Sequence, residues 1–313
     1  MIKAENLSKS YGDRIAVNGL NFEARQGEII GFLGPNGAGK TTTMRMLTGY
    51  MPPTSGTASV AGYDIVTESI SVRKRVGYLP ETVPLYSDMT LYEYLSFFAK
   101  IRQLPDSEKN IIETLEKVGL QDRAKGYIGN LSKGMRQRIG LAQAILHKPE
   151  VLILDEPTIG LDPAQIIEVR NLVRDMGKER TVLLSTHILS EAQQLCDRIL
   201  IINKGQIVAE DTPHNLQSNI AGIERVRLQI RGEIDELAVA IQKIPGVIEV
   251  KYSAGGDELE FTHSPGKDLR PVAARVTIES KFDLIELQSI NLSLEDIFLE
   301  LTKSDIPSPE ELR

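Results

Sequence analysis

The sequence predicts an α/β protein built around a parallel sheet, followed by a smaller ferredoxin-like α+β domain. Continuous apolar runs alternate with helical stretches, as buried parallel strands and their connecting helices do. After about residue 220 the order changes to strand, helix, two strands, helix and strand, the order of a ferredoxin-like unit. We therefore expect one domain over 1–220 and a second over 221–303.

The first domain opens with residues 2–7 and 15–24, which predict an antiparallel hairpin around Tyr11-Gly12-Asp13. Further strands are expected at 57–61, 76–79, 151–154, 181–185, 198–203 and 206–210. Helical periodicity is expected at 91–104, 107–118, 132–146, 163–176 and 189–195.

The second domain is expected to have strands and helices in the ferredoxin-like order given above. Its strands are predicted at 225–230, 247–252, 257–263 and 284–290. Its helices are predicted at 233–243, 268–279 and 293–302. The tail 304–313 contains two prolines and is expected to be disordered.

The composition excludes several classes of protein. The 313 residues are 41% hydrophobic and 25% charged, as in an ordinary globular protein, and the net charge of −7 argues against a nucleic-acid partner. No apolar run approaches the ~18 residues of a membrane span, and the first residues lack a signal-peptide core. We therefore expect a cytoplasmic protein. Its one cysteine, Cys196, excludes an intrachain disulfide and is expected to be a core residue.

A glycine-rich loop is the most specific motif of the chain. Residues 34–42 follow an apolar strand, precede a helix and fit the pattern G-x-x-x-x-G-K-[ST]. Backbone N–H groups of such a loop cradle phosphates, Lys40 can reach the β- and γ-phosphates, and the Thr41 hydroxyl can hold Mg²⁺. The motif predicts a nucleoside triphosphate ligand. The candidate binding residues are Gly34, Asn36, Gly37, Ala38, Gly39, Lys40, Thr41 and Thr42.

An acidic pair ends the apolar strand 151–154. The carboxyl end of a parallel strand lies at the same sheet edge as the phosphate loop, so Asp155 is predicted to reach Mg²⁺ through its water shell. Glu156 is predicted to act as general base on the attacking water. An acidic pair that merely ends a strand is the alternative, and the phosphate loop favours the metal and catalytic roles.

The motifs together resemble those of ATP-binding-cassette (ABC) ATPases. Leu131-Ser132-Lys133-Gly134-Met135 is similar to the signature motif, and a short helix separates it from Leu154-Asp155-Glu156-Pro157-Thr158. The resemblance covers residues 1–220. It implies a P-loop NTPase fold with an antiparallel β subdomain, a parallel-sheet core and a helical subdomain at about 82–145. It also implies hydrolysis of ATP with Mg²⁺.

The resemblance implies further roles within one chain. Tyr11 is similar to the aromatic residue that stacks on adenine, and His187 to the switch histidine that holds the γ-phosphate and the water with Glu156. A lone histidine is otherwise a surface or core residue. Glu81 stands where the family usually has Gln, and a carboxylate oxygen can still ligate Mg²⁺. We hypothesise that Glu81 keeps the metal-sensing role.

The resemblance also implies a second copy of the chain. ATP would lie between the phosphate loop of one copy and the signature loop of the other, where Ser132 and the Gly134 N–H would contact the γ-phosphate. Ser132 as a plain helix cap is the alternative. Asp162 matches the loop that couples the two sites. Lys133 and Met135 replace the common Gly and Gln, as in export-type and gliding-motility-type bacterial cassettes.

Membrane-spanning subunits are the remaining partners that the resemblance implies, docking near residues 82–100. Aromatic side chains there would serve a protein contact or the core of the helical pair, and 84–89 would form a groove for a helix. The chain would then lie on the inner face of the membrane. The signature variant and the C-terminal domain resemble those of exporters, so export is the expected direction of transport. The C-terminal end, 293–302, resembles the closing helix of an accessory domain. The alternative is a soluble ABC ATPase that acts on DNA or the ribosome, which the short spacing between motifs disfavours.

Overall fold

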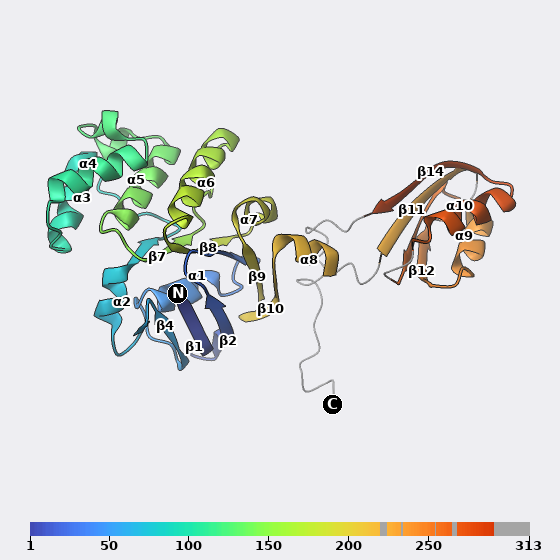
Figure 1. Ribbon diagram of the computed structural model, residues 1–313, viewed down its shortest axis with the longest axis horizontal. Coiled ribbons are helices and arrows are strands. Elements are labelled where there is room, and N and C mark those ends of the chain that lie inside the picture. Colours follow the sequence, from blue (N-terminus) through green and yellow to red (C-terminus); the bar gives the residue numbers. More distant parts are fainter. Residues whose placement is uncertain (220–223, 233, 254, 265–267, 291–313) are drawn as a thin grey trace. The chain divides into compact units, whose positions relative to one another are not determined.

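The chain divides into two compact units, Met1–Pro213 and His214–Arg313 (Figure 1). The computed structural model describes residues 1–219, 224–232, 234–253, 255–264 and 268–290. The predicted helix 293–302 and tail 304–313 lie outside these residues. Within the described ranges, no helix combines the length and apolar content needed to cross a membrane.

An antiparallel sheet forms one layer of the first unit, with the strand order β2-β1-β4-β5. Its strands are β1 (Ile2–Tyr11), β2 (Arg14–Ala24), β4 (Ser55–Val60) and β5 (Tyr63–Asp64). The predicted hairpin is confirmed, since Ile2 pairs with Ala24 and Tyr11 with Arg14. This is the predicted antiparallel β subdomain, and the hairpin brings Tyr11 to the edge of the nucleotide pocket described below.

A six-stranded sheet forms the core of the first unit, in the order β10-β9-β3-β8-β7-β6. Its strands are β3 (Ile29–Leu33), β6 (Val76–Leu79), β7 (Val151–Asp155), β8 (Thr181–Thr186), β9 (Arg198–Asn203) and β10 (Gln206–Asp211). The pairs from β9 to β6 are parallel, and β10 is antiparallel to β9. Both β3 and β7 are buried at every residue, because central parallel strands are covered on both faces. The predicted parallel core is confirmed.

Helices cover this sheet, and some of them form a separate helical subdomain. They are α1 (Lys40–Leu47), α2 (Ser69–Arg75), α3 (Leu91–Ile101), α4 (Ser107–Lys117), α5 (Lys133–Ile145), α6 (Pro163–Gly177) and α7 (Leu189–Leu195), with 3₁₀ turns at Gln121–Arg123 and Ile128–Asn130. Helix α8 (Pro213–Asn219) starts at the last residue of this unit and otherwise belongs to the second. In Figure 1, α3, α4 and α5 gather away from β1, β2 and β4. Helix α3 begins at a capping box in which Thr90 and Glu93 satisfy each other's backbone N–H groups.

The core position predicted for Cys196 is confirmed. Its thiol is buried at the end of α7, and a Cβ atom on Gly31 of β3 would lie 2.7 Å from its sulfur. Burial raises the pKa of the Cys196 thiol, with the neighbouring Asp197 and Glu191 carboxylates adding to the shift. A thiol that stays protonated and buried is unreactive, so Cys196 serves packing between α7 and β3.

The second unit has the ferredoxin-like topology that the sequence predicts. Its sheet has the order β12-β13-β11-β14, and the strand pairs are antiparallel. The strands and helices are β11 (Glu224–Arg231), α9 (Asp235–Gln242), β12 (Val247–Tyr252), β13 (Glu258–His263), α10 (Arg270–Glu279) and β14 (Asp283–Ile290). Alternate residues of β11, namely Val226, Leu228 and Ile230, form a core with residues of both helices.

Phe32 provides a test of the core of the first unit. It is fully buried in β3 and meets Phe22 edge to face, with ring centroids 5.1 Å apart. Phe32→Ala should lower the free energy of unfolding by about 3–5 kcal/mol, because it leaves a cavity. Urea denaturation followed by circular dichroism measures this. The exposed Ile70 is the control, and Ile70→Ala should stay within about 0.5 kcal/mol. Equal effects of the two variants would contradict the core assignment.

Candidate functional site

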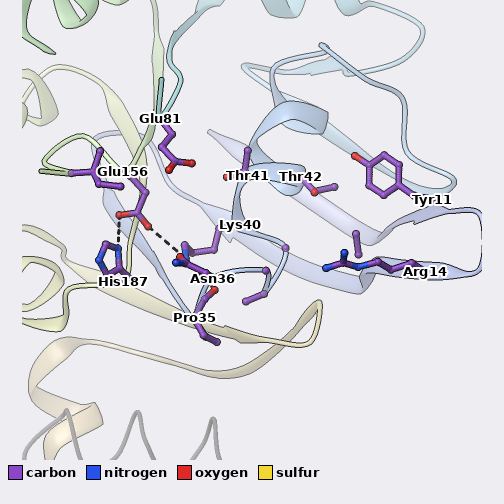
Figure 2. A pocket seen from close by; sticks show the side chains of 15 residues that line it. Tyr11, Arg14, Pro35, Asn36, Lys40, Thr41, Thr42, Glu81, Glu156 and His187 are labelled. Atoms are coloured by element: carbon purple, nitrogen blue, oxygen red, sulfur yellow. Dashed lines mark hydrogen bonds and ion pairs between the residues drawn. The ribbon is translucent and has the colours of Figure 1, made fainter. Parts of the chain in front are cut away.

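A pocket of about 610 Å³ opens where the glycine-rich loop meets the β1–β2 hairpin and the residues that follow β7 and β8 (Figure 2). Most of the residues predicted for the nucleotide site line it, although they come from distant parts of the chain. The lining residues are Tyr11, Arg14, Ala16, Pro35, Asn36, Gly37, Ala38, Gly39, Lys40, Thr41, Thr42, Glu81, Glu156, Ile159 and His187.

The loop geometry suits an anion. Gly37 and Gly39 have φ values of 82° and 106°, which residues with a side chain rarely adopt. A Cβ atom on Gly39 would also lie 2.5 Å from the Ala16 carbonyl oxygen. Gly39 precedes the first turn of α1 and provides no side-chain cap, and the first N–H groups of a helix have no partner within it. These N–H groups and the helix dipole therefore favour a phosphate at this end of α1.

Gly34 has a different role from the other loop glycines. A Cβ atom there would lie 2.4 Å from the Ile202 carbonyl oxygen, so the loop passes close to β9. Gly34 is absent from the pocket lining, and its carbonyl accepts a 2.6 Å hydrogen bond from Lys40 Nζ. The glycine therefore sets the path of the loop and orients the lysine.

Glu156 lies between two partners, which Figure 2 marks with dashed lines. Its Oε1 is 3.5 Å from Lys40 Nζ, and its Oε2 is 2.9 Å from His187 Nδ1. A carboxylate oxygen accepts hydrogen bonds, so His187 Nδ1 is the donor in this contact. The structure thus brings together the predicted catalytic pair and the phosphate-loop lysine.

The backbone of Glu156 is in the left-handed region, with φ at 49°. Such a conformation costs a non-glycine residue of order 1 kcal/mol and persists only where the surroundings impose it. The Glu156 N–H donates to Ser185 Oγ at 2.9 Å, which is one such restraint. The strained turn directs the carboxylate of Glu156 back toward Lys40 and His187.

Asp155 fits the role of a magnesium ligand. It is fully buried and its Oδ1 accepts a 2.6 Å hydrogen bond from Ser185, whereas its Oδ2 has no hydrogen-bond partner among the described residues. Mg²⁺ is typically held by one or two carboxylates, water and substrate phosphates, so one free carboxylate oxygen suits it. Burial and the Asp155 carboxylate raise the pKa of Tyr78 to about 12, so the phenol beside this aspartate is neutral.

Tyr11 and Glu81 lie at different sides of the pocket. Tyr11 is half exposed, its hydroxyl donates to Met51 Sδ at 3.2 Å, and Lys9 Nζ lies 5.7 Å from its ring centroid. Figure 2 shows Glu81 on the same side of the pocket as Thr41. These positions are compatible with an adenine contact at Tyr11 and a metal contact at Glu81.

Sequence reasoning missed two residues of this site. Ser185 joins Asp155 to the Glu156 backbone, and the available signal was a hydroxyl at the carboxyl end of a strand next to β7. Arg14 lines the pocket three residues after Tyr11, and a cation so close to a predicted nucleotide contact was the signal. Neither belongs to a motif with a fixed spacing.

The three signature and coupling residues are not part of this pocket. Ser132 caps α5 and accepts from the Met135 N–H at 3.3 Å, while Asp162 caps α6 and accepts from the Gln165 N–H at 2.9 Å. A Cβ atom on Gly134 would lie 2.6 Å from the side chain of Gln165. The Gln165 side chain therefore packs against Gly134, so the starts of α5 and α6 lie next to each other within one chain.

Comparison with known proteins identifies the family. Residues 17–159 match the family described as ABC transporter. Over 305 residues the chain is 35% identical to the linearmycin resistance ATP-binding protein LnrL of Bacillus subtilis, covering 96% of this chain and 98% of that protein. Over 307 residues it is 38% identical to the bacitracin transport ATP-binding protein BcrA of Bacillus licheniformis, covering 96% and 97%. The chain therefore belongs to the ABC transporter family of ATP-binding proteins.

Solved structures agree with this assignment. A structure described as the ATP binding subunit of an ABC transporter has a TM-score of 0.64 and 31% identity, covering 70% of this chain and 93% of that one. The fold is also that of the dimeric MJ0796 cassette bound to ADP and Pi, with a TM-score of 0.63 at 23% identity, over 68% of this chain and 99% of that one. The predicted ABC ATPase fold is confirmed, and the protein is an ATP-binding and ATP-hydrolysing subunit of an ABC transporter.

Gly39→Ala tests the phosphate loop. The new methyl group would meet the Ala16 carbonyl at 2.5 Å and would require an unfavourable φ, so the loop must shift. We expect ATP affinity to fall at least about tenfold, measured by calorimetry, because the N–H groups no longer converge on the phosphates. Gly27→Ala is the matched control, with a φ of 75° and open space around it. Its affinity for ATP should be unchanged, and a comparable loss there would contradict the account.

Proposed function

We propose that this chain drives export as one half of a homodimer that binds two ATP with Mg²⁺ and works on separate membrane-spanning subunits. The observation that carries the proposal is the placement of Lys40, Glu156 and His187 in one pocket. The signature residues lie outside that pocket, so a second copy of the chain is needed to supply them.

Within one chain, the residues divide the chemistry of hydrolysis. Glu156 accepts the proton of the attacking water. His187 orients the Glu156 carboxylate by donating from Nδ1, and a protonated Nε2 would donate to the γ-phosphate. Lys40 neutralises phosphate charge as the new bond forms. Mg²⁺, held by Thr41, Asp155 and Glu81, would stabilise the charge on the β- and γ-phosphate oxygens.

The second copy would complete the site with Ser132, the Gly134 N–H and Asp162. Helix α5 supports this, since its first turn contains no acidic residue and its N-terminus favours an anion. Lys133 adds a positive charge at the same end. Gln165 joins this helix start to Asp162, so contact with the partner's ATP would reach the coupling loop directly.

A groove of about 670 Å³ is the proposed docking site for the membrane subunits. It lies beside the predicted docking segment and includes Thr82, Pro84 and Phe98 from it. Arg45, Arg73 and Arg102 also line the groove and make it basic. An amphipathic helix with acidic residues fits such a groove. Through this contact the chain would be held at the cytoplasmic face of the membrane.

Export as the direction of transport rests on the relatives. They are named for linearmycin resistance, for bacitracin transport and, at 34% identity over 310 residues, for Nod factor export in Burkholderia orbicola. We propose that residues 221–303 are the accessory domain of such a cassette and help to hold the dimer. Action on DNA or the ribosome is the disfavoured alternative, because the net charge is −7.

Isolation of the complex from gently solubilised native membranes tests the proposed function. The tagged Glu156→Gln variant with ATP should hold the closed dimer, and we expect a polytopic membrane protein to co-purify. Arg102→Glu, at the C-terminus of α3, reverses one charge in the groove and should weaken this association without changing ATP binding. Recovery of soluble partners alone would contradict the transporter function.

Glu156→Gln tests the general base. The amide cannot accept the proton, so we expect kcat to fall by roughly 10²-fold or more while ATP affinity changes by less than about threefold. Phosphate release and calorimetry measure the two quantities. Glu150→Gln, at an exposed carboxylate next to the start of β7, is the control and should keep full activity. Wild-type kcat in Glu156→Gln would rule out this role.

Glu81→Ala tests the metal-sensing hypothesis. Loss of a carboxylate ligand should raise the Mg²⁺ concentration for half-maximal ATPase activity by about threefold or more, and Glu81→Gln should restore part of it. A magnesium titration of activity measures the shift. The hypothesis fails if both the activity and the titration curve of Glu81→Ala match those of the wild type.

A further inference from the structure

A buried carboxylate lies behind the two catalytic loops. Glu191, in the first turn of α7, is only 4% exposed. Its Oε2 accepts hydrogen bonds from Thr158 Oγ1 at 2.6 Å and from Thr186 Oγ1 at 3.1 Å. Among the described residues, its Oε1 has no hydrogen-bond partner and no cation pairs with the carboxylate. Glu191 lies outside the sequence motifs described above.

The two hydroxyls belong to the loops that carry the catalytic pair. Thr158 follows Glu156 by two residues, in a turn closed by a hydrogen bond from the Ile159 N–H to the Glu156 carbonyl. Thr186 directly precedes His187, and its Oγ1 also accepts from the Ile188 N–H at 3.0 Å. One carboxylate oxygen therefore bridges the turn after β7 and the turn after β8.

The desolvation cost of the buried Glu191 carboxylate indicates that this bridge has a functional role. A buried carboxylate without a cation is costly, and an apolar side chain would fill the same space without desolvation. Ser185 already joins the two strand ends at Asp155 and at the Glu156 N–H. The Ser185 contacts hold Asp155 and the N–H of the strained residue Glu156. Glu191 instead holds Thr158, two residues after Glu156. The left-handed conformation of Glu156 is thus held from both sides.

We propose that Glu191 is a positioning residue for ATP hydrolysis. Its hydrogen bonds to Thr158 and Thr186 fix the positions of these two turns relative to each other. The Glu156 carboxylate and His187 Nδ1 therefore stay at their 2.9 Å contact. Glu191 is absent from the residues that line the nucleotide pocket. The inference rests on the proposed roles of Glu156 and His187, and it concerns the chemical step and not the binding of ATP.

Glu191→Ala and Glu191→Gln form the first test. Alanine leaves both hydroxyls without their acceptor, and we expect kcat to fall roughly tenfold or more with KM for ATP within about twofold. Glutamine can keep its oxygen on the two hydroxyls and place its amide where Oε1 has no partner, so it should recover most of kcat. Glu179→Ala, at an exposed carboxylate, is the control and should leave both constants unchanged.

A double variant tests whether Glu191 acts through the bridge. Thr158→Val removes one of the two hydroxyls and should lower kcat by itself, with less risk to folding. The combination of Thr158→Val with Glu191→Ala should lose no more activity than Glu191→Ala alone. Independent, multiplied losses would overturn the proposal, as would a higher KM at unchanged kcat.

The catalytic roles of Glu156 and His187 and the positioning role of Glu191 can be tested separately. If Glu156→Gln keeps full activity, the proposed catalytic pair is wrong. If Glu156→Gln is inactive while Glu191→Ala has wild-type kcat, only the positioning role is wrong. Should Glu191→Ala not fold, Thr158→Val and Thr186→Val carry the same test, and unchanged kcat in both would overturn the proposal.

Discussion

The position of the Glu156 carboxylate between Lys40 and His187 is the constraint on which the rest of the site depends. These three residues follow β7, β3 and β8, which are neighbours in the sheet although they are far apart in the chain. Parallel strands end at one edge, so the fold brings the Lys40 ammonium group, the Glu156 carboxylate and the His187 imidazole to one place. The strain at Glu156 and the hydroxyl contacts around it are the local consequence of bringing them so close.

This geometry supports a site that is divided between two copies of the chain. The phosphate loop and the Glu156 carboxylate of one chain line the pocket, yet its own signature residues lie outside it. The capped starts of α5 and α6 are joined to each other through Gln165 instead. Under the proposed function, such a chain binds ATP in its own pocket and a second copy would enclose it. Closure of the proposed dimer would couple ATP binding to a large movement, because Ser132 of the signature loop caps α5 of the helical subdomain.

Much of the fold could be predicted because its signals are local. Apolar runs mark β3 and β7, and helical periodicity marks α3 to α6, whereas β5, α2 and α8 were not predicted. β5 has only two residues, and α2 buries only Val72, so neither shows a hydrophobic period. The phosphate loop was found because its spacing is fixed by the ligand. Ser185 and Glu191 could not be found in the same way. Their roles depend on hydroxyl–carboxylate contacts between strand ends that only tertiary structure brings together.

Complementation between two inactive variants tests the shared site most directly. Lys40→Ala removes the phosphate-loop cation of one copy, and Ser132→Arg blocks the signature loop of the other. Each alone should lack ATPase activity, because both sites of its dimer are defective. An equal mixture should regain roughly a quarter of wild-type activity, since half of the dimers are mixed and each has one intact site. A mixture that stays inactive, or Ser132→Arg that is fully active alone, would contradict the account.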